Sequence, residues 1–177
     1  LAAPAPSGAG TMIAPYPYRP KEFAFIYEGG LFHLFYIRHN ILAPHLDSTE
    51  VDFGHAVSQD LASWTHLEPV LRARPGKWDD LHVWSPTIIR ENGVYYMYYT
   101  GVTIPPGQSH LYQRTGVATS TDLVSWERYD EPVFDANRVP WAFADSSQYP
   151  GCQFRDPFVM PDPGVSGRWL MYYVATP

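Results

Sequence analysis

The sequence predicts an all-β fold, a β-propeller built from four-stranded antiparallel blades. Two internal repeats carry this prediction. The segment 54–64 returns as 116–126, with Gly, Ala, Ser, Asp-Leu and Ser-Trp in the same register. An aromatic motif also recurs, at residues 33–36, 96–99 and 170–173. A period of roughly 60 to 75 residues with aromatic and β-branched content is typical of a repeated sheet unit.

The blades can be followed along the chain as strands separated by turns. The first blade is expected over residues 22–71, with strands over 22–27, 31–36, 52–58 and 64–71. The second is expected over residues 84–134, with strands over 85–90, 94–100, 115–120 and 126–134. Its Asn92-Gly93 pair is the strongest hairpin signal in the chain. A third blade begins over residues 154–177, with strands over 155–160 and 169–174.

This division gives a flexible leader over residues 1–20 and a partial propeller domain over residues 21–177. Two full blades and half of a third would leave an apolar blade face and an unpaired strand edge in solvent. We therefore expect Leu170, Tyr172 and neighbouring aromatics to bury against further blades of a longer protein, or against a second chain in an oligomer.

Composition supports a folded domain and excludes several partners. Hydrophobic residues make up 45% of the 177 residues and charged residues only 17%, which is enough apolar material for a core. A net charge of -6 without a basic cluster argues against nucleic acid or an anionic membrane as partner. Cys152 has no intrachain partner and is expected to be a small, partly buried side chain. The first ten residues fit either the remainder of a cleaved secretory signal, giving a secreted or periplasmic protein, or a simple leader.

Aligning the inner strands by the repeat brings three residues to equivalent positions. They are Glu22, Ser85 and Asp156, each at the start of an inner strand, where a propeller lines the mouth of its central channel. Two of the three are carboxylates, and Ser85 between them is a candidate for substrate binding. Glycosidic bond cleavage needs paired carboxylates, since one group supplies a proton and another stabilises or attacks the developing cation.

Further candidates for substrate binding lie in segments that the repeat does not explain. The segment Trp78 to Trp84 leads into the inner strand of the second blade, and it suggests sugar stacking on Trp84 and hydroxyl binding by Asp79, Asp80 or His82; a plain loop is the alternative. His55 replaces Val117 of the other copy and could reach the channel or be a structural histidine. The unrepeated segment 139–149 could form a wall of the cleft. The histidines show no metal-ligand spacing, and we expect neither a metal nor a cofactor.

Two repeated pairs are expected to be structural. Asp60 and Asp122 precede leucine at identical repeat positions, where an Asx-type turn is expected. Trp64 and Trp126 recur in the same way and are expected to pack within the blades.

Three segments together resemble a known group of enzymes. They are residues 53–67, residues 93–101 and Phe154-Arg155-Asp156-Pro157-Phe158-Val159. This ordered set, within a likeness that covers about residues 22 to 175, is similar to the five-bladed propeller glycosidases: the invertase and fructan-hydrolase family (family 32) and its arabinanase and xylosidase relatives (family 43). The resemblance implies five blades, of which about two and a half are present here. It also implies that Asp156 either stabilises the transition state by binding substrate hydroxyls, with Arg155 beside it, or orients the proton donor.

The sequence departs from this family at two points. The fructan family has its nucleophile in an Asn-Asp-Pro-Asn segment, where this chain has Pro20-Lys21-Glu22-Phe23. Glu22 is therefore the candidate nucleophile or base, and Asp52 is the next candidate. The family's general acid comes from a later blade, outside residues 1–177. We expect a glycoside hydrolase acting on furanosidic or related glycans of fructan or arabinan type. The alternatives are a carbohydrate-binding propeller without catalysis and a structural propeller used for protein contacts.

Overall fold

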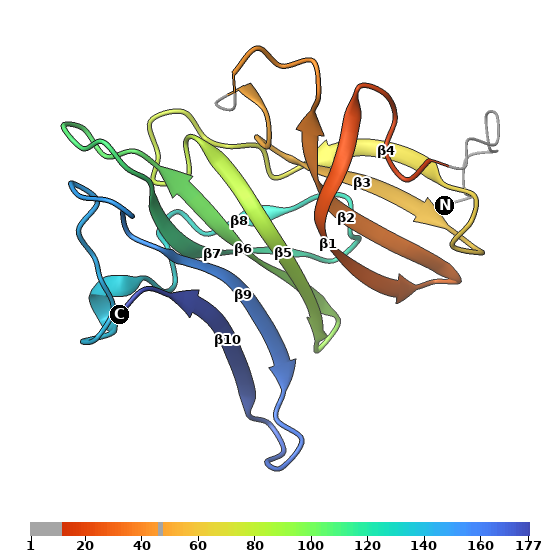
Figure 1. The fold of residues 1–177 in the computed structure, drawn as a ribbon. Helices are drawn as coiled ribbons and strands as arrows, with labels where there is room; N and C mark the ends of the chain where they lie inside the picture. The colour runs from red at the N-terminus through yellow and green to blue at the C-terminus, as the bar shows by residue number, and fades with distance from the viewer. Residues whose placement is uncertain (1–11, 46–47) are drawn as a thin grey trace.

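The computed structural model describes residues 12–45 and 48–177, and within them the fold is all-β as predicted (Figure 1). Two four-stranded antiparallel sheets and one hairpin follow each other along the chain. The first sheet contains β1 (Tyr18–Glu28), β2 (Leu31–Asn40), β3 (Phe53–Ser58) and β4 (Thr65–Val70). The second contains β5 (His82–Glu91), β6 (Val94–Thr103), β7 (Tyr112–Ser120) and β8 (Glu127–Arg128). The hairpin contains β9 (Phe154–Pro161) and β10 (Trp169–Ala175). No helix in this part of the chain is long and apolar enough to cross a membrane.

The turn residues explain the hairpins. Asn92 and Gly93 both have positive φ, 49° and 81°, and they join β5 to β6 as predicted. Gly29 and Gly30 do the same between β1 and β2, with φ of 58° and 84°. Positive φ at both central residues matches the right-handed twist of the flanking strands, so each two-residue turn sets the register of its blade.

Two boundaries differ from the sequence prediction. The first strand begins at Tyr18, inside the expected leader, because this segment packs on the blade: Ala14 is only 4% exposed and the Arg38 guanidinium lies 4.3 Å from the Tyr18 ring centroid. The expected leader's residues 1–11 lie outside the described residues. The outer strand expected over residues 126–134 is reduced to the two residues of β8, followed by a single bridge to Phe134. Pro132 has no N–H with which to extend the ladder.

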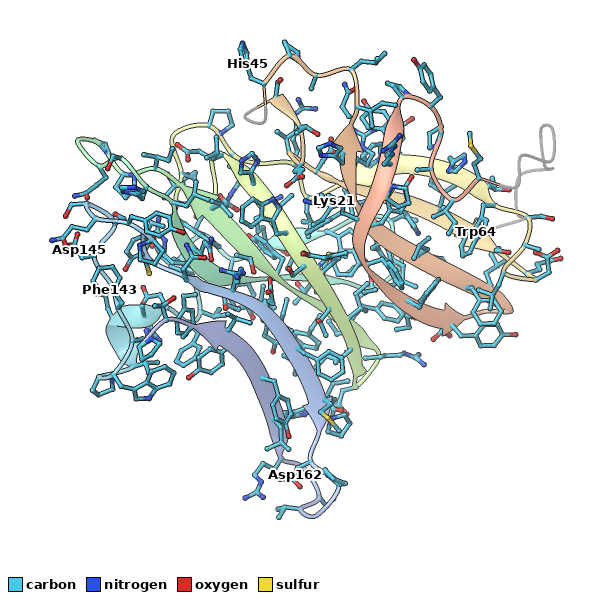
Figure 2. The ribbon with its side chains drawn as sticks, in the orientation of Figure 1. Lys21, His45, Trp64, Phe143, Asp145 and Asp162 are labelled. Atoms are coloured by element: carbon cyan, nitrogen blue, oxygen red, sulfur yellow. The ribbon has the colours of Figure 1, made fainter. Side chains whose placement is uncertain are left out.

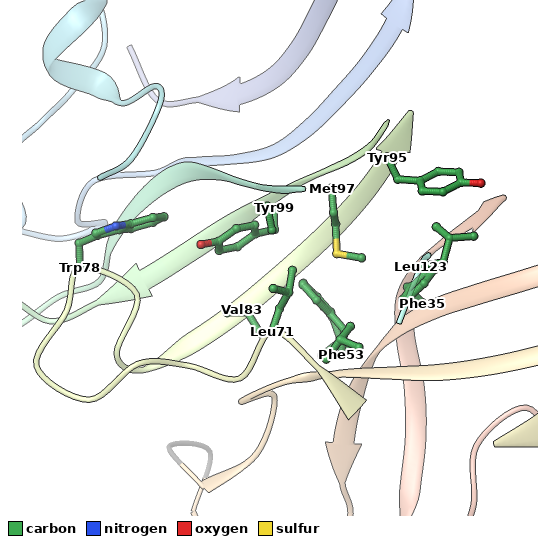
Figure 3. Packing of buried hydrophobic residues seen from close by; sticks show 12 residues of the cluster. Phe35, Phe53, Leu71, Trp78, Val83, Tyr95, Met97, Tyr99 and Leu123 are labelled. Carbon is green, nitrogen blue, oxygen red and sulfur yellow. The ribbon is translucent and has the colours of Figure 1, made fainter. Parts of the chain in front are cut away.

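The main core lies between the first and second sheets (Figure 3). Phe35 and Phe53 from the first sheet meet Met97 and Tyr99 from the second, all with no more than a trace of exposed surface. Trp126 packs edge-on against Phe35 at 5.7 Å, which confirms the packing role expected for this tryptophan. Each such buried side chain contributes roughly 1.5–3 kcal/mol. This core fixes the first blade against the second and thereby fixes their inner strands relative to one another.

The repeated aspartates form the expected turns. Asp60 Oδ1 accepts hydrogen bonds from the amides of Ala62 and Ser63, at 2.9 and 2.7 Å. Asp122 repeats the arrangement with Val124 and Ser125 at the same two distances. The backbone hydrogen bonds lower the pKa of the Asp60 carboxyl to about 2. Both residues are therefore turn-forming residues outside the site.

The outer face of the third blade is open in this chain. Phe158 on β9 and Tyr172 on β10 are 55% and 58% exposed. The expectation that Tyr172 and its neighbours bury against further blades or a second chain stays a prediction. Cys152, by contrast, is fully buried, more than the partial burial expected, and burial raises the pKa of its thiol to about 11.

Candidate active site

The three residues aligned by the repeat meet at one point. The inner strands β1, β5 and β9 lie next to each other (Figure 1), and they carry Glu22, Ser85 and Asp156 respectively. Ser85 Oγ donates a short hydrogen bond to Glu22 Oε2 and lies 2.6 Å from Asp156 Oδ1. A serine hydroxyl has one proton and donates a hydrogen bond to one carboxylate at a time. Ser85 thus links a carboxylate of the first blade to one of the third.

A β-bulge in each inner strand positions these side chains. The strand registers shift between Pro20 and Phe23, between Trp84 and Thr87, and opposite Asp156 and Pro157. A bulge adds an unpaired residue and redirects its side chain. Ser85 and Asp156 accordingly have left-handed φ values of 50° and 58°. Pro157 lies within β9, and the bulge makes its missing N–H harmless there.

Asp156 is held from several sides and still reaches solvent. Its amide donates to Thr100 Oγ1 at 2.9 Å, and Arg155 Nε lies 3.3 Å from Oδ2. Arg155 also contacts the side-chain oxygens of Gln153 and Gln113. The side chain of Asp156 remains 38% exposed, so a ligand can approach the carboxylate.

Glu22 is exposed, and its neighbour in the bulge is anchored. Lys21, near the centre of Figure 2, donates to Glu50 Oε1 at 2.8 Å, and His39 Nδ1 lies 3.0 Å from the same oxygen. Burial alone would raise the pKa of the Glu50 carboxyl, but these two hydrogen bonds hold the pKa below its ordinary value. The ionised Glu50 therefore anchors Lys21 and the bulge that presents Glu22.

Asp79 does not fit the substrate-binding role expected from the sequence. It is fully buried, and both carboxylate oxygens are occupied. Arg74 Nε lies 2.9 Å from Oδ1, while Arg128 and the Tyr99 hydroxyl donate to Oδ2 at 2.7 and 2.9 Å. A sugar hydroxyl has no access to this carboxylate, whose contacts are those of a structural ion network.

His55 is also placed in the interior. It stacks on Phe35 with ring centroids 4.2 Å apart, and its Nε2 lies 3.0 Å from His33 Nδ1. Burial lowers the pKa of His55 to about 3. These contacts fit the structural-histidine alternative and do not bring His55 to the carboxylates.

Trp84 and His82 lie at the edge of the site. Trp84 directly precedes Ser85, and its ring stacks on His82 at 5.1 Å with an interplanar angle of 14°. His82 is buried, with Nδ1 3.1 Å from the carbonyl oxygen of Thr49. His82 is thus a support for the Trp84 ring, while Trp84, half-buried, stays a candidate for stacking on a sugar.

Asp80 lies at an open cavity of about 660 Å³, which is lined by loop residues and by the end of β6 and the start of β7. Trp78, Arg114 and Asn137 line this cavity together with Asp145 from the unrepeated segment 139–149. Figure 2 shows Asp145 and Phe143 on the opposite side of the molecule from Trp64. The residues that line the cavity do not include Glu22, Ser85 or Asp156, and no hydrogen bond or ion pair within the described residues joins Asp80 to the carboxylate pair. A cleft wall formed by residues 139–149 stays a prediction.

Asp52, the second candidate for nucleophile or base, is paired with an arginine. Arg38 donates to both of its oxygens at 2.6 Å, and only 4% of the Asp52 side chain is exposed.

Two threonines that contact the Asp156 bulge were not predicted from the sequence. Thr100 Oγ1 accepts a hydrogen bond from the Asp156 amide, and Thr87 Oγ1 donates to the Pro157 carbonyl at 2.7 Å. Thr87 lies two residues after Ser85 on the same inner strand, and this position could have indicated it as a site residue. No nearby sequence feature indicates Thr100.

The sequence matches the family model described as "Glycosyl hydrolases family 32 N-terminal domain" over residues 23–177. The chain belongs to this family. A 6(G)-fructosyltransferase of Asparagus officinalis is 39% identical over 114 residues, 60% of this chain and 17% of the relative. An insoluble β-fructofuranosidase isoenzyme of Arabidopsis thaliana is 33% identical over 148 residues, 81% of this chain and 24% of the relative. The chain thus spans about a fifth of the length of these two relatives.

Solved structures agree on the fold. A family 32 β-fructofuranosidase of Bombyx mori superposes with a TM-score of 0.61 at 21% identity, covering 89% of this chain and 29% of that one. An exo-1,5-α-L-arabinanase from a bovine ruminal metagenomic library gives a TM-score of 0.54 at 22% identity, covering 83% and 45%. The expected likeness to both groups of propeller glycosidases is confirmed, and the sheets described above are propeller blades.

Proposed function

We propose that this chain is part of the catalytic propeller of a glycosidase that cleaves fructose-containing glycans. The observation that carries the proposal is the meeting of Glu22 and Asp156 on either side of Ser85. Membership of family 32 supports the fructan-type substrate, since the two relatives named above are a fructosyltransferase and a β-fructofuranosidase.

In this proposal the two carboxylates have different roles. Asp156, held by Arg155 and Thr100, binds substrate hydroxyls and stabilises the oxocarbenium-like transition state. Glu22, exposed at its bulge, is the nucleophile or base. The single bridging hydroxyl keeps the two carboxylates within about two hydrogen-bond lengths, roughly 5.5 Å. Both negative charges therefore face one small region, where a cationic sugar ring would be stabilised.

The proton donor comes from another blade, as further blades complete the ring. Its distance from Glu22 decides the stereochemistry: about 5–5.5 Å gives retention of configuration and roughly 6.5–9.5 Å gives inversion. With extracellular carbohydrate as substrate, the protein would be secreted. The substitution of glutamate for the family's aspartate favours one alternative, a carbohydrate-binding propeller that has lost catalysis.

The test is sugar release by the full-length protein from fructan, arabinan and xylan. Asp156→Asn should lower kcat about a hundredfold or more, because it removes the charge that favours the transition state while nearly preserving shape. Glu22→Gln should cause a comparable loss if Glu22 is nucleophile or base. Asp80→Asn, at the separate cavity, is the control and should retain activity. Glycan binding without release by the wild type would instead establish the carbohydrate-binding alternative, and neither binding nor release would refute both.

A further inference from the structure

Three hydroxyl groups of the second blade surround the Asp156-Pro157 bulge of the third. Thr100 Oγ1 accepts from the Asp156 amide at 2.9 Å, Ser85 Oγ lies 2.6 Å from Asp156 Oδ1, and Thr87 Oγ1 donates to the Pro157 carbonyl at 2.7 Å. The bulge thus receives a partner for its N–H, its carboxylate and its next carbonyl, all from β5 and β6.

The bulge needs these partners. Asp156 has a left-handed φ of 58°, which is unfavourable for a residue with a Cβ and persists only where the surroundings hold it. The register shift also takes the bulge's backbone groups out of the β9–β10 ladder, and buried backbone groups must be paired. Side chains from the neighbouring blade supply the pairing that the strand cannot.

We infer that Ser85, Thr87 and Thr100 act as a hydroxyl clamp, a set of positioning residues across the seam between blades two and three that fixes the Asp156 carboxylate opposite Glu22. The inference rests on the proposed function and assigns Ser85 to positioning rather than to substrate binding. A misplacement of about 1 Å in a catalytic constellation can cost roughly a hundredfold in rate, so the clamp bears directly on turnover.

Thr100→Val is the decisive variant because valine keeps the shape and removes the acceptor for the Asp156 amide. The chain offers a matched control. Thr115 on β7 is the cross-strand partner of Thr100, is equally buried, and its hydroxyl has no hydrogen-bond partner within the described residues. Thr115→Val therefore changes the same group in the same environment without touching the clamp. Thr100→Ser restores the oxygen.

In the full-length protein, Thr100→Val should lower kcat on fructan about a hundredfold with KM near that of the wild type. Thr100→Ser should recover most of the rate, and Thr115→Val should stay within about twofold. Hydrogen exchange of the Asp156 amide should accelerate at least about tenfold in Thr100→Val alone. Thr87→Val, at a half-buried position, repeats the test if Thr100→Val does not fold.

Equal effects of Thr100→Val and Thr115→Val, or unchanged exchange at Asp156, would overturn the clamp. An inactive wild type would refute the proposed function instead. The exchange measurement would then still decide whether the clamp holds the bulge.

Discussion

Replacing Asp79 by asparagine tests whether this residue holds the fold together or binds sugar. The carboxylate is fully buried and faces two arginines, one of which, Arg128, has only 9% of its side chain exposed. Asparagine keeps the shape and one acceptor oxygen but removes the charge. The Arg128 guanidinium then remains in the interior without its counter-ion, whereas Arg74 keeps its ion pair with Asp130.

The expected cost follows from the burial of the network. Breaking a buried ion pair by removing one partner typically costs about 3–5 kcal/mol, because the remaining charge is desolvated and unpaired. Arg74 is less buried and also pairs with Asp130, so losing its contact with Asp79 should cost about 3–4 kcal/mol, the lower half of that range. For a domain of this size the melting temperature should fall by about 10 °C.

Urea unfolding followed by tryptophan fluorescence measures the loss directly. Trp78 precedes Asp79, stacks on Tyr99 and donates its indole N–H to the Asp130 carbonyl at 2.7 Å, so its emission reports on this network. Asp80→Asn, at the exposed neighbour, is the matched control and should leave the midpoint unchanged. A loss below about 1 kcal/mol together with weakened glycan binding would refute the structural role and restore the one expected from the sequence.

Two further predictions concern stability. The pKa of His55 is about 3 in the fold and 6.5 as its ordinary value, so as pH falls the unfolded state binds the proton first. The free energy of unfolding should therefore be highest above about pH 6.5 and should fall by roughly 1.4 kcal/mol per pH unit as pH drops toward 3. Denaturation midpoints at pH 7 and 5 check this, and His55→Phe should flatten the dependence, which a persisting slope of the same size would contradict. Gly116→Ala should destabilise by about 1–3 kcal/mol, since a Cβ there would lie 2.5 Å from Tyr99 Cζ, and an unchanged melting temperature would show that the ring gives way.

The repeat made much of the fold readable from the sequence. Hairpin turns, strand order and the Asx turns all depend on local residues, and Asn92-Gly93 and Asp60 are cases where a few neighbouring residues decide the conformation. The outer strand was overestimated because the repeat equates residues 126–134 with the strand expected over 64–71. The single bridge between Phe134 and Thr115 depends on tertiary packing that the repeat does not show.

The site was predictable only where the repeat could be counted. Equivalent positions in successive blades must meet at the centre of a propeller, and this placed Glu22, Ser85 and Asp156 correctly relative to each other. The burial of Asp79 was not predictable in this way. Its partner Arg128 lies 49 residues away, and no local pattern marks the pair.

The three equivalent positions also show how one scaffold carries different chemistry. In the first two blades a tyrosine ring covers a repeated glycine, Tyr36 over Gly54 and Tyr99 over Gly116, so the same packing shapes both. The inner-strand position is instead glutamate, serine and aspartate in turn. A third carboxylate in place of Ser85 would bring three like charges into contact, at a cost that grows in a partly desolvated site. The hydroxyl of Ser85 in the middle position carries no charge and can donate to either neighbouring carboxylate. Two carboxylates can therefore face each other across the second blade.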